Sequence, residues 1–170
     1  MTILLVRHAE PVTVPEVAPT RWRLSAAGRT DARALGPRLP FDGVWVSSTE
    51  TKAHETLSCA GAGRVEIRQD PGFDEVVRDE PFDDGYVARR LAWVEGRLDE
   101  RHAGWEAPHE VADRFEQAVS TYAEAGTPLV VCSHGMAMTA WLRHARGRLS
   151  QEEAGPFWSS LGFPDLVRVD

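Results

Sequence analysis

The stretch Ile3-Leu4-Leu5-Val6-Arg7-His8 runs from four apolar residues directly into an arginine and a histidine. This short, non-alternating apolar run predicts a strand that is buried on both faces. Arg7 and His8 would then lie at the carboxyl end of that strand, which is the edge where open α/β sheets bind their ligands. The stretch therefore predicts an anion site with His8 at its centre.

Composition limits the classes of protein to which the chain can belong. With 170 residues, 42% of them hydrophobic, we expect one domain over residues 1–170. A net charge of -7 argues against a broad basic face for nucleic acid, although a local cationic pocket remains compatible with it. No apolar run approaches the roughly 20 residues of a membrane span, and the N-terminal run is too short for a signal peptide. Cys59 and Cys132 lack metal-ligand spacing, so we expect reduced core residues of a cytoplasmic protein.

Apolar strands alternate with helical patterns along the chain. Buried strands are predicted at residues 43–47 and 128–132, a half-exposed strand at 65–68, and a final strand at 166–169. Helical spacing is found after Ser25, from Ser48 to Gly61, between Val87 and Leu98, between Val111 and Tyr122, and after Gly135. This alternation predicts a three-layer α/β/α fold, a mostly parallel central sheet with helices on both faces. Two long loops, residues 9–23 and 69–85, remain.

Serines precede three of the predicted helices. Ser25 is expected to be an N-cap, the pair Ser47-Ser48 is expected to cap the next helix, and Ser150-Gln151-Glu152-Glu153 fits a capping box. These serines set the expected helix starts.

Three predicted strands end in residues of compatible chemistry. The first ends in Arg7-His8, the second in Ser47-Ser48 with Lys52 one helical turn further on, and another in Ser133-His134-Gly135. In a parallel sheet these three ends share one edge, where helix N-termini add unpaired N–H groups and partial positive charge. A planar guanidinium matches phosphate oxygens well, so phosphate is the anion that we expect.

Several segments resemble motifs of one family, the histidine phosphatase superfamily of phosphoglycerate-mutase-like proteins. Arg7-His8-Ala9 resembles its Arg-His-Gly or Arg-His-Ala signature, and Ser133-His134-Gly135 is similar to its second-histidine turn. Between them, in the family's order, residues 24–29, 46–56 and 73–75 are similar to its Leu-Thr-x-x-Gly segment, its Ser-Ser-x-x-x-Arg-Ala-x-x-Thr stretch and its acid-glutamate loop. The resemblance covers residues 3 to 145.

The resemblance implies a site and a reaction. His8 would attack phosphorus and form a phosphohistidine, while Arg7, Lys52, His134 and Gly135 would bind the phosphoryl group. Glu75 would protonate the leaving oxygen and later deprotonate the attacking water. No metal or cofactor is implied, because cationic side chains hold the phosphate.

The chain departs from the family pattern at one phosphate-binding position. Lys52, the only lysine of the chain, stands where the family has arginine, so the charge is kept but the bidentate fork is lost. Asp74, Asp79 and Glu80 are alternative candidates for the acid role of Glu75. A general acid needs a raised pKa, and neighbouring carboxylates favour one.

Hydrolysis of a phosphomonoester is the favoured function, with a small phosphorylated metabolite or a phosphoprotein as substrate. A mutase is the alternative, although the chain has no counterpart of the Glu-Arg-His-Tyr-Gly stretch of similar mutases. A non-catalytic phosphoryl-binding protein is the other alternative, because of Lys52. A metal held by His8 and His134 is disfavoured, since neither has a partner at ligand spacing. We expect no nucleic-acid or membrane partner, and the sequence carries no signal for an oligomeric state.

Overall fold

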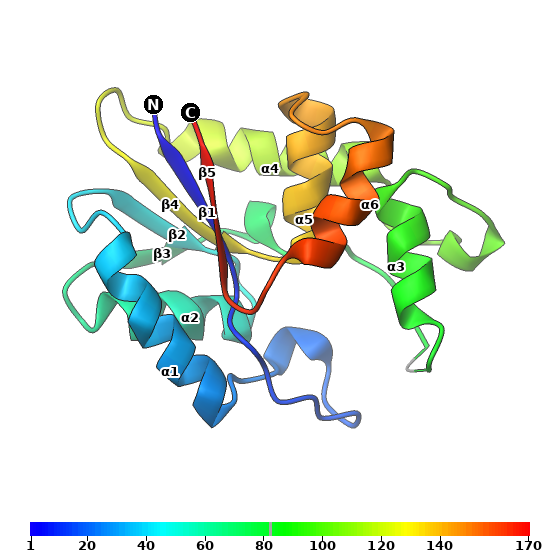
Figure 1. Cartoon of the computed structure of the whole chain (residues 1–170), viewed down its shortest axis with the longest axis horizontal. Coiled ribbons are helices and arrows are strands. Elements are labelled where there is room, and N and C mark those ends of the chain that lie inside the picture. Colours follow the sequence, from blue (N-terminus) through cyan, green and yellow to red (C-terminus); the bar gives the residue numbers. More distant parts are fainter. Residues whose placement is uncertain (82) are drawn as a thin grey trace.

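The described part of the computed structural model, residues 1–81 and 83–170, forms a five-stranded sheet in the order β3-β2-β4-β1-β5 (Figure 1). β1 and β2 both pair in parallel with β4, and β3 pairs in parallel with β2. β5 runs antiparallel to β1 at the edge of the sheet. The strands are β1 (Ile3–Arg7), β2 (Val44–Ser47), β3 (Ile67–Gln69), β4 (Leu129–Ser133) and β5 (Asp165–Val169). The predicted mostly parallel sheet is therefore confirmed.

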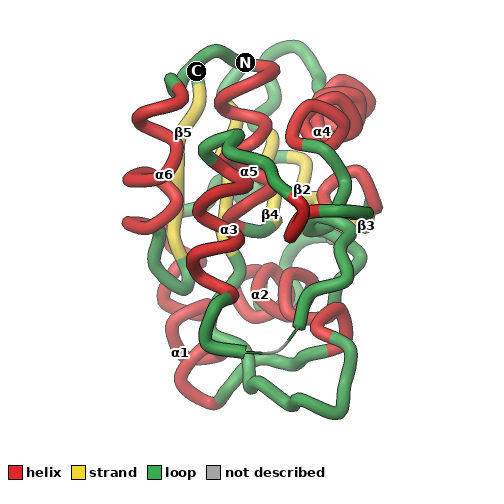
Figure 2. Tube along the Cα trace, turned by 90° about the vertical axis from the view of Figure 1, so that its right-hand side faces the viewer, coloured by secondary structure: helices red, strands yellow, loops and turns green. Residues whose placement is uncertain are grey.

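Helices cover both faces of this sheet, as predicted (Figures 1 and 2). They are α1 (Ala26–Leu35), α2 (Thr51–Gly61), α3 (Tyr86–Val94), α4 (Pro108–Tyr122), α5 (Gly135–Ala140) and α6 (Gln151–Ser160). Short 3-10 turns lie at Pro19–Arg21, Gly36–Arg38, Pro71–Phe73 and Glu100–His102, and a π-helical turn, Trp141–Ala145, continues α5. Among the described residues, every helix is too short or too polar to cross a bilayer.

The alternate side chains of β1 enter two separate cores. Ile3 and Leu5 pack in the larger cluster with residues of α3, α4 and α5, such as Trp93. Leu4 and Val6 pack in the cluster that α1 and α2 complete, which includes Leu57. A strand between two helical layers needs apolar residues on both faces, and this explains the unbroken apolar run that precedes Arg7.

Two of the three predicted serine caps are confirmed. Ser25 Oγ accepts the Gly28 N–H at 2.9 Å, and Ser150 forms the capping box with Glu153. The cap predicted from Ser47-Ser48 is wrong, because α2 begins at Thr51 and its N-cap is Glu50. The hydroxyl of Ser48 lies outside the helix and donates instead to Asp74 at 2.6 Å.

Other expected boundaries move by a few residues. The helix expected to reach Leu98 ends at Val94, because Gly96 adopts a φ of 72°, and Leu98 is exposed. β3 begins at Ile67 rather than at Val65, whose side chain packs on the second core. The long loop predicted over residues 69–85 contains the turn Pro71–Phe73, and its position 82 lies outside the described residues. Cys132 is buried and Cys59 partly buried, and both are free thiols.

Candidate active site

The carboxyl ends of β1, β2 and β4 lie side by side, so the residues that follow them meet. In the sheet register, Arg7 is level with Ser133, and Ser47 is level with Cys132. The rings of His8 and His134 are 5.1 Å apart between centroids. The structure thus brings together residues 126 positions apart in sequence, as the parallel arrangement predicted.

His8 is held as a neutral imidazole with one defined tautomer. Its Nδ1 donates to the Ala9 carbonyl at 2.8 Å, and since a carbonyl only accepts, the proton is on Nδ1 and the Nε2 lone pair is available. The Ala9 N–H donates in turn to Thr56 Oγ1 at 2.9 Å, which fixes the backbone beside the ring. Burial, followed by the charges of His134 and Lys52, lowers the pKa of His8 well below its ordinary value. The ring is therefore neutral at pH 7.

His134 is oriented by a relay of hydrogen bonds. Its Nε2 lies 2.9 Å from Ser48 Oγ, and Ser48 gives its only hydroxyl proton to the Asp74 carboxylate. Nε2 must then be the donor to Ser48, which leaves the lone pair of His134 on Nδ1. Burial, and next the charge of Lys52, lowers the pKa of His134 well below its ordinary value.

Arg7 is a partly buried cation with an unused donor. One Nη donates to the Leu161 carbonyl at 2.6 Å, and the guanidinium lies 3.6 Å from the centroid of the Phe163 ring. Burial lowers the pKa of Arg7 to about 10, against the opposing charges of Glu75 and Asp165, so Arg7 stays charged at pH 7. Its Nε is buried and has no acceptor among the described residues. A buried donor without a partner is rare, and an anion bound here would supply one.

Lys52 contributes a second cation near the two histidines. The side chain is only 8% exposed, and its charge acts on the pKa of both His8 and His134. Nζ forms an ion pair with Glu50 and donates to the Pro19 carbonyl at 2.9 Å. The lysine thus lies near both histidines but is already engaged on two sides.

Glu75 is the predicted acid whose carboxylate reaches the start of α5. Its Oε1 accepts the Ala137 N–H at 3.1 Å, one turn from His134. Burial would raise the pKa of Glu75, but the nearby His134 and Arg78 lower it below its ordinary value. Substrate-free Glu75 is therefore ionised at pH 7.

The three rival carboxylates are engaged or remote. Asp74 accepts from Ser48 and from the Thr49 hydroxyl, the latter at 2.7 Å. Glu80 is paired with arginines of its own loop and of α3, and Asp79 is exposed. This arrangement favours Glu75 as the acid.

Gly135 allows the arginine to approach the first turn of α5. A Cβ atom at this position would lie 3.1 Å from Trp158 Nε1 and 3.3 Å from Arg7 Cζ. A larger residue would therefore displace the guanidinium or the indole.

Sequence reasoning did not single out several residues that surround the histidines. The sequence predicts Ser48 only as a helix cap and Thr56 only as part of a motif, and Gly162 and Pro164 interrupt any pattern around Phe163. Glu50 carried no signal at all, since a glutamate just before a helix is usually solvated. Among the described residues, no group of three or more His, Cys, Asp or Glu side chains is arranged to hold a metal ion.

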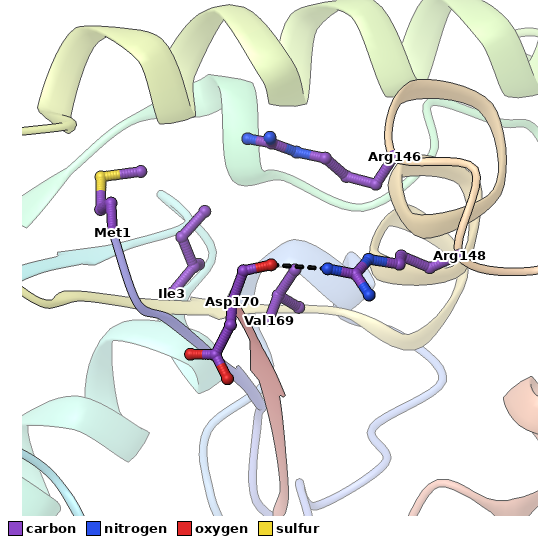
Figure 3. A pocket seen from close by; sticks show the side chains of 6 residues that line it. All are labelled: Met1, Ile3, Arg146, Arg148, Val169 and Asp170. Atoms are coloured by element: carbon purple, nitrogen blue, oxygen red, sulfur yellow. Dashed lines mark hydrogen bonds between the residues drawn. The ribbon is translucent and has the colours of Figure 1, made fainter.

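A separate hollow lies at the other end of β1 (Figure 3). It is lined by Ile3 and Val169 together with Arg148, which donates to the Asp170 carbonyl. None of the predicted site residues lines it, so this hollow is not the candidate active site.

The family model of the histidine phosphatase superfamily (branch 1) matches residues 3–157. The chain belongs to this superfamily. No curated protein matches it in sequence. Among solved structures of similar fold are mycobacterial glucosyl-3-phosphoglycerate phosphatase complexed with VO3 (22% identity, TM-score 0.73, covering 99% of this chain and 92% of the other) and the same enzyme with inorganic phosphate (22% identity, TM-score 0.74, 99% and 89%). A third is YhfR of Bacillus stearothermophilus (19% identity, TM-score 0.74, 99% and 90%). These similarities extend along nearly the whole histidine phosphatase chain.

Proposed function

We propose that this histidine phosphatase superfamily member hydrolyses phosphomonoesters through a phosphohistidine on His8, without a metal ion. The observation that carries the proposal is the hydrogen bond from His8 Nδ1 to the Ala9 carbonyl at 2.8 Å. It leaves Nε2 unprotonated in a ring that burial keeps neutral, and a neutral imidazole nitrogen is the form that can attack phosphorus.

Two displacements account for the reaction. His8 Nε2 first bonds to phosphorus while the ester P–O bond breaks, and Glu75 gives its proton to the departing oxygen. Water then attacks the phosphohistidine, Glu75 takes a proton from that water, and the N–P bond breaks to release phosphate. Arg7, Lys52 and the start of α5 at Gly135 stabilise the phosphoryl oxygens as charge shifts, which is the main contribution in phosphoryl transfer.

The substrate itself prepares Glu75 for the acid role. In the empty site the pKa of Glu75 is lowered, with His134 and Arg78 opposing the effect of burial. A phosphate dianion bound between Arg7 and Lys52 brings a negative charge near the carboxylate of Glu75, and a neighbouring negative charge favours the protonated form of a carboxyl. Glu75 is then protonated when an ester is bound.

The substrate class is a phosphomonoester of a small metabolite or of a protein. One similar structure is a phosphatase of glucosyl-3-phosphoglycerate and binds inorganic phosphate, so a phosphorylated metabolite is the first class to test. The free thiols of Cys59 and Cys132 suit a reducing cytoplasm.

One observation favours a second candidate, a non-catalytic protein that binds phosphoryl groups. Lys52 replaces the expected arginine and is paired with Glu50, which weakens the grip on the phosphoryl oxygens. Such a protein would bind inorganic phosphate without turning over an ester. A mutase would instead transfer the phosphoryl group from His8 to a second hydroxyl.

The test follows phosphate release from p-nitrophenyl phosphate by wild type, His8→Ala and His109→Ala. His109 is an exposed histidine of α4 outside the site, so its variant is the matched control. We expect His8→Ala to lose turnover by about 10³-fold or more, with His109→Ala like wild type. An acid-labile phosphoryl adduct should form on wild type and on Glu75→Gln but not on His8→Ala.

The other candidates predict different results. Phosphate binding by wild type with no turnover of any ester tested supports the binding protein and overturns the phosphatase. Transfer of the phosphoryl group to an added alcohol, in place of its release as phosphate, supports the mutase.

A further inference from the structure

The reaction described above leaves one buried carboxylate unused, that of Glu50. The residue immediately precedes α2 and is 5% exposed, yet its side chain makes no helix-capping bond. Its two oxygens turn instead toward Lys52 and Glu75. Oε2 pairs with Lys52 Nζ, and Oε1 accepts the backbone N–H of Glu75 at 2.9 Å.

The same carboxylate also lies beside the second histidine. Glu50 Oε1 is 3.6 Å from His134 Nε2. Glu50 therefore contacts one cation that binds phosphate, the loop that carries the acid, and the edge of a histidine that faces His8. Because Glu50 is buried, water screens the charge of its carboxylate only weakly.

The formal charges of Arg7, Lys52, Glu50 and Glu75 consequently sum to zero before substrate binds. Arg7 and Lys52 bring two positive charges, whereas Glu50 and Glu75 bring two negative charges, and both histidines are neutral. Of the three protons on Lys52 Nζ, one is directed to Glu50 and one to the Pro19 carbonyl. One proton of the ammonium remains for a phosphoryl oxygen.

We propose that Glu50 is a positioning residue with two effects: it holds Lys52 and the Glu75 backbone in place, and its charge weakens the binding of phosphate dianion so that the product leaves. This inference rests on the proposed phosphatase function. Binding that is equally strong for substrate, transition state and product slows product release and does not raise kcat. A carboxylate paired with the phosphate-binding lysine reduces that uniform binding while it keeps the lysine in reach.

The first test is Glu50→Gln, which removes the charge but keeps an oxygen acceptor of the same shape. We expect the Kd of inorganic phosphate, measured by calorimetry, to fall by about tenfold. KM should fall with it, while kcat stays the same or falls because product leaves more slowly. Glu55→Gln is the matched control, since Glu55 lies on α2, the helix that Glu50 precedes, and pairs with Arg23 and Arg29. It should leave the Kd of phosphate unchanged.

The second test separates the positioning effect from the charge effect. Glu50→Ala removes both oxygens, so the Glu75 N–H and Lys52 lose their acceptor. We expect kcat to fall by roughly 10 to 100-fold, and Glu50→Gln to restore most of it because the amide oxygen can accept. If Glu50→Gln lowers stability, phosphate should still raise its Tm more than it raises that of wild type.

The outcomes distinguish the two proposals. If the wild-type protein turns over an ester but the Kd of phosphate is unchanged or higher in Glu50→Gln, the charge effect alone is overturned. Equal kcat values for Glu50→Ala and Glu50→Gln overturn the positioning effect. Tighter phosphate binding by Glu50→Gln in a protein without turnover supports the charge effect and overturns the phosphatase function.

Discussion

In the proposed reaction, Glu75 has to be protonated when an ester is cleaved, although the empty site lowers its pKa. Its proton matters in proportion to how poor the leaving group is. We therefore expect Glu75→Gln to slow cleavage of an alkyl phosphate by about 10² to 10⁴-fold and to slow cleavage of p-nitrophenyl phosphate much less. The measurement is kcat/KM for a series of phosphate esters with leaving groups of different pKa.

The control for this series is Asp79→Asn, at an exposed carboxylate of the same loop. It should give the wild-type dependence on the leaving group. An equal loss for alkyl and aryl esters in Glu75→Gln would mean that this carboxylate positions other groups and does not donate the proton.

The strand-end residues of the candidate site could be placed from sequence because the carboxyl ends of parallel strands lie at the same edge of a sheet. Arg7 ends β1, and His8 and His134 directly follow β1 and β4, so the strands determine where these residues lie. The direction of the Glu50 side chain could not be predicted in this way. It depends on Lys52 and on the backbone of Glu75, and those contacts exist only after the loop has folded over the start of α2.

The start of α1 packs tightly on the loop that follows His8, and one glycine makes this possible. A Cβ atom at Gly28 would lie 2.3 Å from the Glu10 carbonyl oxygen, a backbone atom that cannot simply move aside. We expect Gly28→Ala to lower the free energy of unfolding by about 1 to 3 kcal/mol, measured by urea denaturation. It should also reduce activity, because the displaced segment leads directly to Ala9 and His8.

Gly162→Ala is the comparison substitution. A Cβ atom there would meet nothing closer than 3.5 Å, so stability should be unchanged or raised by up to about 1 kcal/mol, through lower entropy of the unfolded chain. Similar losses for both variants would show that the close approach of Gly28 to Glu10 does not limit stability.

The elements differ in how far their position in the fold can be predicted from the local sequence pattern. The apolar run of β1 predicts burial on both faces because each alternate side chain needs its own core. The tail is different, since Phe163 lies against Arg7 only because β5 pairs antiparallel with β1 and sets Asp165 level with Arg7. Gly162 and Pro164 interrupt any pattern there, and the pairing partner lies more than 150 residues away. The turn that places Phe163 beside Arg7 could therefore not be predicted from the local sequence.

Taken over the whole protein, the site and the stability of the fold have opposed requirements. Two neutral histidines are buried at the centre of the sheet edge, where burial lowers the pKa of each well below its ordinary value. In the unfolded chain both titrate near pH 6.5. Between that value and the lower folded values, the unfolded state binds more protons than the folded state, so the free energy of unfolding decreases as the pH falls. Above about pH 6.5 neither state is protonated and this loss disappears.

The expected size of this effect can be measured directly. Between about pH 7.5 and 5.5, each buried histidine should lower the free energy of unfolding by about 1.4 kcal/mol, so the pair should account for near 3 kcal/mol. The double variant His8→Asn/His134→Asn should lose correspondingly less over this range in urea denaturation, whereas His109→Asn, at an exposed histidine, should behave like wild type. The stabilisation that comes from the lowered pKa of Glu75 is fully present above about pH 4.5 and is lost only below it, so it stays constant over this window. Equal losses in wild type and the double variant would mean that both histidines are protonated in the folded protein at pH 5.5, and that the neutral imidazole required for attack by His8 is not held by burial.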